Sequence, residues 1–104
     1  MKIIKKIAEM IEDELEGSEE YIELAMKHHE DFPEVAQTFY ELAQTEMGHV
    51  EILHTQVVRL IEKHRREHGA PPETMLAVWE YAHEKHMAKA AKIKAMFAEF
   101  KNKS

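Results

Sequence analysis

The chain of 104 residues contains no cysteine. This absence excludes disulfide bonds, thiolate metal sites, a cysteine nucleophile and a rubredoxin-type iron centre. Glycine and proline are also scarce, with three of each, so few positions interrupt secondary structure. Because 44% of the residues are hydrophobic, a chain of this length predicts one domain, residues 1–104, with a modest core.

Long apolar runs and basic clusters are missing as well. No stretch reaches the roughly 18 apolar residues of a transmembrane helix, and acidic residues from Glu9 onward interrupt the N-terminal segment. The net charge is −6, and the 14 Lys and Arg residues are dispersed. Nucleic acids and anionic membranes are therefore not expected as partners, whereas cations are mildly favoured. We expect a soluble, cytoplasmic protein.

The remaining composition favours an all-α fold, since the uninterrupted stretches are rich in good helix formers. Asp31, Pro33 and Glu34 are typical of a helix start, with Asp31 as the N-cap. Gly69, before a double proline, is typical of a helix end. The sequence predicts three antiparallel helices, at about residues 2–29, 33–68 and 73–101. The second helix would be about 50 Å long, which suggests that helices from more than one chain pack together.

Three Glu-x-x-His pairs occur, and the direction in which each points separates them. At about 100° per residue, Glu46 lies within the apolar stripe of the second helix and His49 lies about 60° from it. Glu51 of the second helix and Glu80 of the third helix face solvent, about 130–140° from the apolar stripes of their helices. The stripe used for Glu46 comprises Val35, Phe39, Leu42, Leu53, Val57 and Leu60.

The first helix offers one carboxylate that points inward, Glu14, whereas Glu16 and Glu20 point away. If the first two helices form a hairpin that turns near residues 31 and 32, position 14 lies opposite position 49. Glu14, Glu46 and His49 would then meet at one height. The apolar side that places Glu14 comprises Ile3, Ile7, Ile11, Ile22 and Ala25, with Ser18 among them.

The third helix has no ligand at that height, where residues 92–95 read Lys-Ile-Lys-Ala. One chain therefore offers two carboxylates and one imidazole, which is half of the donor set of a di-iron site in a helical bundle. An identical hairpin related by a two-fold axis would supply the other half. We expect a homodimer or a larger homo-oligomer with the metal site at its interface.

Residues 12–25, EDELEGSEEYIELA, and residues 39–54, FYELAQTEMGHVEILH, resemble the ferritin-like superfamily, specifically rubrerythrin-like and half-ferritin (encapsulated-ferritin-like) chains. The resemblance implies a four-helix bundle completed by dimerisation, and ferroxidase or peroxide-reducing chemistry at a di-iron site. It also implies that Glu14 and His49 are terminal ligands and that Glu46 is the bridging, catalytic carboxylate. The spacing of Glu16 to Glu46 suits the family too, so Glu16 remains an alternative to Glu14. A second inward Glu-x-x-His is missing, and the ending FKNKS is no recognisable encapsulin-targeting tail.

Mixed Glu and His ligation suits Fe(II) or Mn(II), and Zn(II) is a further candidate. The leading hypothesis is oxidation of Fe(II) by O₂ or peroxide. The alternatives are a helical assembly protein with a structural metal or none, and a metal sensor without redox chemistry.

A candidate secondary metal cluster comprises His54, His83 and His86. Positions 54 and 86 share a height in the predicted hairpin, and His86 lies in the apolar stripe of the third helix with His83 at its border. The competing interpretation is that these are core histidines that are hydrogen-bonded to carbonyl groups or to Glu.

Overall fold

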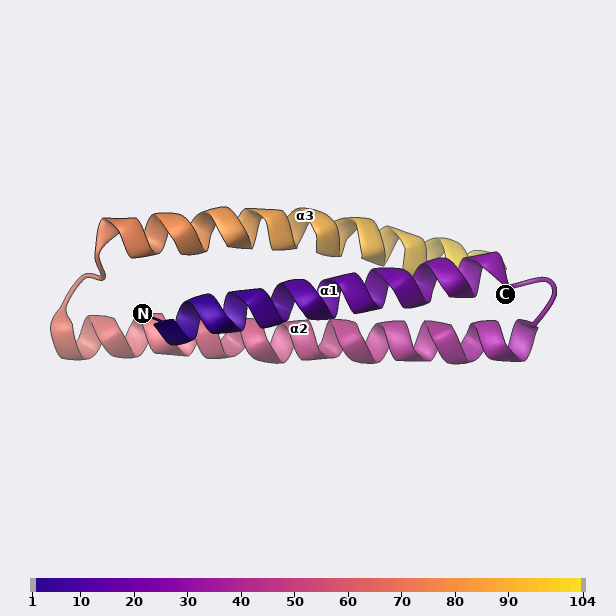
Figure 1. Cartoon of the computed structure of the whole chain (residues 1–104), viewed down its shortest axis with the longest axis horizontal. Helices are drawn as coiled ribbons and strands as arrows, with labels where there is room; N and C mark the ends of the chain where they lie inside the picture. The colour runs from indigo at the N-terminus through magenta and orange to yellow at the C-terminus, as the bar shows by residue number, and fades with distance from the viewer. Residues whose placement is uncertain (1, 104) are drawn as a thin grey trace.

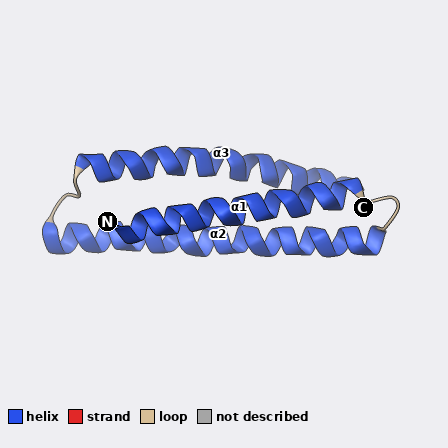
Figure 2. Ribbon diagram, in the orientation of Figure 1, coloured by secondary structure: helices blue, strands red, loops and turns tan. Residues whose placement is uncertain are grey.

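The computed structural model describes residues 2–103 as three long helices joined by two short connections (Figure 1). Their bounds are α1 Lys2–Lys27, α2 Pro33–His68 and α3 Glu73–Lys103. No strand occurs in the described part of the chain (Figure 2). The prediction of an all-α chain with three helices is therefore confirmed.

The helices lie side by side in a rod of 56 × 19 × 17 Å. The two connections lie at opposite ends of the rod, so α2 runs antiparallel to both α1 and α3 (Figure 1). The backbone of α1 packs along both α2 and α3. Aromatic rings bridge α2 and α3, because Tyr40 lies against Phe97 and Phe100. Within residues 2–103, no helix combines the length and apolarity that crossing a bilayer requires.

The helix ends show which capping predictions hold. Helix α1 ends at Lys27, two residues earlier than expected, and the following turn is bridged by His28 Nδ1 and the Asp31 carboxylate at 3.3 Å. Asp31 is not the N-cap of α2: that position is Phe32, which makes no capping bond through its side chain. The prediction of the C-terminal glycine is confirmed, since Gly69 has φ of 80° and its N–H donates to the Arg65 carbonyl.

The core face of α2 differs from the predicted stripe. Val35 and Leu42 are 48% and 39% exposed, whereas Ala36 and Ala43 are fully buried. The small alanine side chains let α2 approach α1 closely, so the buried arc lies about 90° round the helix from the larger apolar residues. Ile3 of α1 is likewise exposed. The buried residues of α2 are Ala36, Ala43, Met47, Val50, Val57 and Ile61.

The core faces of the other two helices follow the prediction more closely. In α3, Trp79, Ala90, Ile93 and Phe100 are buried, as is His86. In α1 the buried set is Ile4, Ile7, Ile11, Leu15, Ser18, Ile22 and Ala25.

Candidate metal centre

Glu14 of α1 and Glu46 and His49 of α2 meet midway along the rod. One potential ligand atom from each residue lies within 4.8 Å of the other two, and no other such group of three occurs among the described residues. His49 Nδ1 lies 3.2 Å from Glu14 Oε2. The side chains of Glu14 and His49 are 28% and 49% exposed, so the group is open on one side. The structure thus brings together the three residues that the height argument places together.

The electrostatics of the group are dominated by its two carboxylates. A hydrogen bond with Glu14 raises the pKa of Glu46, because this bond needs a proton between the two oxygens. Burial and the negative charge of Glu14 raise the pKa of Glu46 further, while His49 opposes them. Glu46 therefore binds a proton more readily than an isolated carboxyl group, and a divalent cation would compete with protons for the same oxygens.

Two features of α1 position the carboxylate of Glu46. Ser18 Oγ donates a buried hydrogen bond of 2.8 Å to the Ala43 carbonyl, which ties α1 to α2 one helical turn from the site. A Cβ atom at Gly17 would lie 3.5 Å from the carboxylate of Glu46. Gly17 therefore lies directly beside the carboxylate of Glu46.

The other carboxylates considered for the site lie outside this group. Glu16 and Glu51 are exposed, and neither belongs to the group around Glu46. Glu80 is also exposed, on α3. The arrangement therefore favours Glu14 over Glu16 as the neighbour of Glu46.

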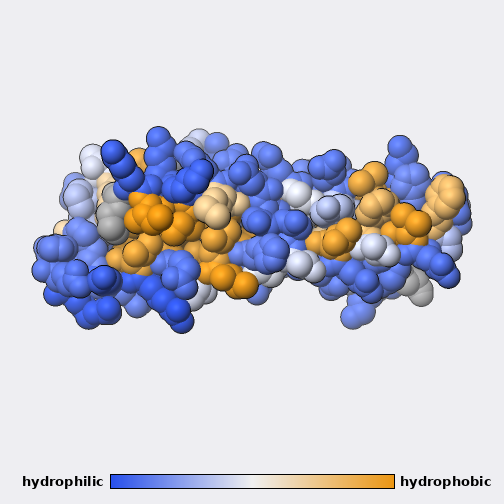
Figure 3. Space-filling view, turned by 60° about the horizontal axis from the view of Figure 1, so that its bottom comes forward, coloured by the Kyte–Doolittle hydropathy of each residue, from blue (hydrophilic) through white to orange (hydrophobic). Residues whose placement is uncertain are grey.

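The face of α1 and α2 that carries the site has apolar surface on both sides of it. Figure 3 shows two apolar patches separated by a hydrophilic middle. Tyr21 and Phe39 are half-buried and their rings stack with centroids 6.2 Å apart. The exposed apolar residues of this face are Ile3, Met10, Val35 and Leu42. Ile3 and Met10 belong to α1, and Val35 and Leu42 belong to α2, so both helices contribute to the exposed apolar surface.

His54, His83 and His86 also lie together, packed around Trp79. The rings of His54 and His83 stack with centroids 4.8 Å apart, and Trp79 stacks on His83 at 5.5 Å. Burial lowers the pKa of His54 and of His86, with smaller contributions from the neighbouring imidazoles, while Glu12 raises that of His86. The Nδ1 atoms of His83 and His86 are buried without a hydrogen-bond partner, so the carbonyl and Glu partners expected for those atoms are not found. The metal role of this cluster stays a prediction.

Sequence reasoning missed several features that support the two clusters. It placed Ser18 on the buried side but could not identify the carbonyl that it binds. The contact of Gly17 with Glu46 could have been suspected, because Gly17 is three residues from Glu14 and shares its face. The sequence analysis placed His54 with His83 and His86, but it did not foresee that their rings pack around Trp79, although Trp79 and His83 are four residues apart.

No protein-family model, curated protein or solved structure matches this chain.

Proposed function

We propose that the chain is a ferritin-like di-iron protein that binds Fe(II) and oxidises it with O₂ or peroxide, at a site shared between two copies. The observation that carries the proposal is the gathering of Glu14, Glu46 and His49 around one point. Two carboxylates and an imidazole suit Fe(II), with Mn(II) and Zn(II) as competitors.

The pKa shift of Glu46 supports a cation at this position. Two carboxylates that are held close together gain from a divalent ion, because the ion neutralises both charges. Metal affinity should therefore rise with pH, since protons compete with the ion for the same oxygens.

The exposed apolar surface supports the second copy. One chain supplies three ligands, and the apolar patches on both sides of the site would be buried if an identical α1–α2 face packed against it. Val35 and Leu42, which the single chain leaves exposed, would then become part of the core of a four-helix bundle. The single site on the two-fold axis would hold two ions between four Glu and two His.

In the proposed reaction Glu14, Glu46 and His49 would hold the iron, which would supply the electrons, with Glu46 in the bridging role and Glu14 and His49 in the terminal roles that the resemblance implies. Each Fe(II) gives up one electron, so a pair reduces O₂ to hydrogen peroxide, with two protons, or peroxide to two waters. Glu46 and Glu14 offset the added positive charge of the ferric products.

The proposal is tested by anaerobic Fe(II) titration followed by exposure to oxygen. The expected results are one iron per chain, a ferric absorbance after oxygen, and a doubled mass in solution. Glu46→Ala should abolish both the binding and the oxygen consumption. Glu51→Ala is the matched control, because it removes an exposed carboxylate from the same helix and should change neither.

The outcomes separate the alternative functions. Binding of one metal per chain without oxidation would indicate a sensor or a structural metal. Absence of binding, with oligomer state and thermal stability indifferent to chelators, would indicate an assembly protein. Unchanged oxygen consumption in Glu46→Ala would reject the site.

A further inference from the structure

The two halves of α3 are attached to the rest of the molecule in different ways. Ala90, Ile93 and Phe100 are buried in the C-terminal half, and Trp79 and His86 are the buried residues of the N-terminal half. The C-terminal half therefore docks through an apolar core, whereas the N-terminal half depends mainly on one indole and one imidazole.

Polar and aromatic contacts reinforce the C-terminal half. The Nζ atoms of Lys89 and Lys92 lie 3.6 and 3.1 Å from the carboxylate oxygens of Glu19 on α1. The ring of Phe100 packs on that of Tyr40 of α2, with centroids 4.8 Å apart. This half is thus held to both helices of the α1–α2 hairpin.

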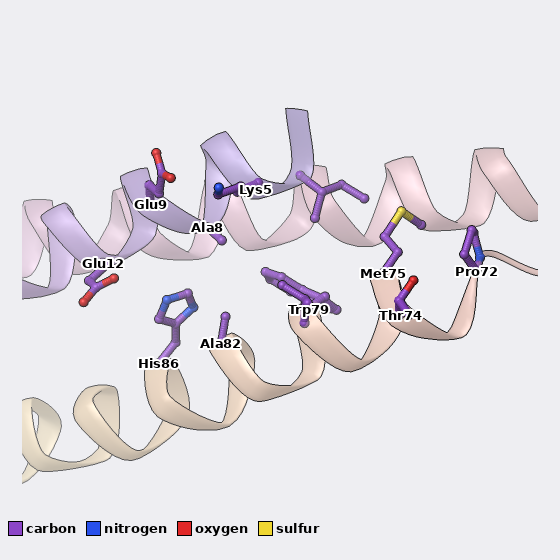
Figure 4. Close-up of a pocket in the computed structure, with 12 residues that line it drawn as sticks. Lys5, Ala8, Glu9, Glu12, Pro72, Thr74, Met75, Trp79, Ala82 and His86 are labelled. Atoms are coloured by element: carbon purple, nitrogen blue, oxygen red, sulfur yellow. The ribbon is translucent and has the colours of Figure 1, made fainter. Parts of the chain in front are cut away.

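The contact between α1 and the N-terminal half of α3 is incomplete. A pocket of about 570 Å³ opens between them. In Figure 4, Trp79, Ala82 and His86 project from α3 towards Ala8 and Glu12 of α1 across this gap. Because atoms that line a gap lose contacts on one side, the pocket weakens the docking of this half.

Stacked rings make the contact between the N-terminal half and α2. The rings of His54 on α2 and His83 on α3 lie 4.8 Å apart, and Trp79 lies 6.0 Å from His54 and 5.5 Å from His83. In the described part of the chain, these imidazoles do not bring three ligand atoms within 4.8 Å of one another. They pack as rings, so a positive charge on them would oppose the contact.

Protonation of the cluster opposes the docked state. His86 is 6% exposed and its Nδ1 has no hydrogen-bond partner among the described residues, so an imidazolium there would bury an N–H donor without an acceptor. Burial lowers the pKa of His54 and of His86, and the neighbouring His83 lowers both further. The two histidines are therefore neutral in the docked state at pH 7, and they gain protons more readily in water.

The charged groups around His86 counter this effect only in part. Glu12 of α1 raises the pKa of His86, but Glu12 is exposed and the solvent screens its charge. On α3, Lys85 and Lys89 line a neighbouring pocket together with His86 and disfavour its positive charge. From α2, His54 acts in the same direction. Acidification is therefore expected to act against docking.

We propose that acid releases the N-terminal half of α3, residues 73–86, from the α1–α2 hairpin while the C-terminal half stays docked. The trigger is proton uptake by His54 and His86. The released segment exposes the indole of Trp79, and its departure uncovers the apolar side chains that face it on α1. The switch does not depend on metal binding at the candidate metal centre.

Amide hydrogen exchange measured along the chain tests the proposal, with protection factors corrected for the effect of pH on intrinsic exchange. Each histidine that gains its proton on release raises the opening equilibrium constant by up to about tenfold per pH unit below about 6.5. Protection of residues 73–86 should therefore fall at least about tenfold between pH 7.5 and pH 5, and that of residues 90–103 by less than about threefold. Acrylamide quenching of Trp79, the only tryptophan of the chain, should rise over the same range.

Substitutions identify the groups that carry the response. His54→Leu/His86→Leu should remove most of the pH dependence at residues 73–86, because neither leucine can take up a proton. Glu12→Gln, at an exposed position, should enlarge the acid response by removing the charge that favours protonated His86 in the docked state. His68→Gln, which removes an exposed imidazole, is the control and should change nothing.

Three results would overturn the assignment. The first is an equal loss of protection at residues 73–86 and 90–103, because α3 would then leave as a whole. The second is an acid response that both His54→Leu/His86→Leu and Glu12→Gln leave unchanged. The third is an acid response that disappears in the presence of a chelator, because it would then report the release of a metal ion.

Discussion

Two clusters of side chains in the molecule contain histidine, and the surroundings of the histidines differ between them. His49 lies half-exposed between two carboxylates, whereas His54, His83 and His86 lie around Trp79 under α3. In the first cluster the neighbouring carboxylates favour bound protons, and the pKa of Glu46 is raised. In the second, burial removes protons, and the pKa values of His54 and His86 are lowered. The same side chain thus serves a charged site in one place and an apolar core in the other.

The carboxylate cluster is therefore suited to binding a cation, whereas the histidine and tryptophan cluster is suited to stabilising the fold. The carboxylate pair makes the metal-free chain less stable at neutral pH, because two like charges are held together. The histidine and tryptophan cluster packs α3 onto the α1–α2 hairpin and contributes to folding. Substitutions in the two clusters should therefore change the free energy of unfolding of the metal-free chain in opposite directions.

The largest effect is expected for Trp79→Ala. This substitution removes a nearly buried indole that contacts three imidazoles, and should lower the free energy of unfolding by about 3–5 kcal/mol. Urea denaturation measures the loss. Val78→Ala is the matched control, because Val78 is 65% exposed, and a comparable loss there would show that the cluster is not the source.

A smaller loss is expected on acidification. Because the folded-state pKa values of His54 and His86 are depressed, their contribution to stability is complete above the unfolded value of about 6.5. It declines as the pH falls below 6.5 and is lost once the pH passes the folded-state values. Glu12 partly counteracts this for His86, and His83 reinforces it.

The pH effect is measured by urea denaturation between pH 7.5 and pH 5. The double variant His54→Leu/His86→Leu should have a flatter dependence of stability on pH than the wild type. His68→Gln removes an exposed imidazole and is the control. Equal slopes in the wild type and the double variant would contradict the account.

Ser18→Ala should lower the free energy of unfolding by about 1 kcal/mol, the net contribution of one buried hydrogen bond. The same substitution should weaken Fe(II) binding, because the bond holds α1 against α2 beside the site. Thr55→Ala removes an exposed bond within α2 and should change stability by no more than about 0.5 kcal/mol. Unaltered iron affinity in Ser18→Ala would separate the bond from the site.

The smallest effect has the opposite sign. Glu46→Gln removes one of two like charges and should stabilise the metal-free chain at pH 7, by at most about 1 kcal/mol for such half-exposed groups. The raised pKa of Glu46 means that this gain shrinks as the pH falls and the native carboxylate becomes protonated. Thermal denaturation of the metal-free protein, with Glu51→Gln as control, measures it. Destabilisation would show that the carboxylate pair is not strained.

The three helices and the height at which Glu14 meets His49 could be predicted from the sequence, because helix periodicity and the position of the turn determine both. The sequence was not sufficient for the core face of α2. Val35 and Leu42 are as apolar as Val50 and Ile61, and only contact with α1 decides which arc is buried. The buried alanines were the available signal, since small residues permit close helix packing.

The meeting of His54 with His83 and His86 could be predicted from the height that positions 54 and 86 share, but the packing of the rings around Trp79 could not. His83 and His86 lie on α3 with Trp79, and His54 reaches them from α2, across the one connection between these helices. The pocket beside Trp79 is a property of the gap between α1 and α3, and no spacing within either helix predicts it.

Two of the three glycines lie inside helices at the height of the candidate metal centre: Gly17 lies beside Glu46, and Gly48 stands between Glu46 and His49 in the sequence, on the side of α2 that faces away from them. Each costs its helix about 1 kcal/mol relative to alanine. Long helices normally open from their ends inward, but here the intrinsic weakness of α1 and α2 falls near the centre of the rod. Local opening of the backbone should therefore be coupled to the site itself, so that a ligand bound there would slow amide exchange in the middle of both helices.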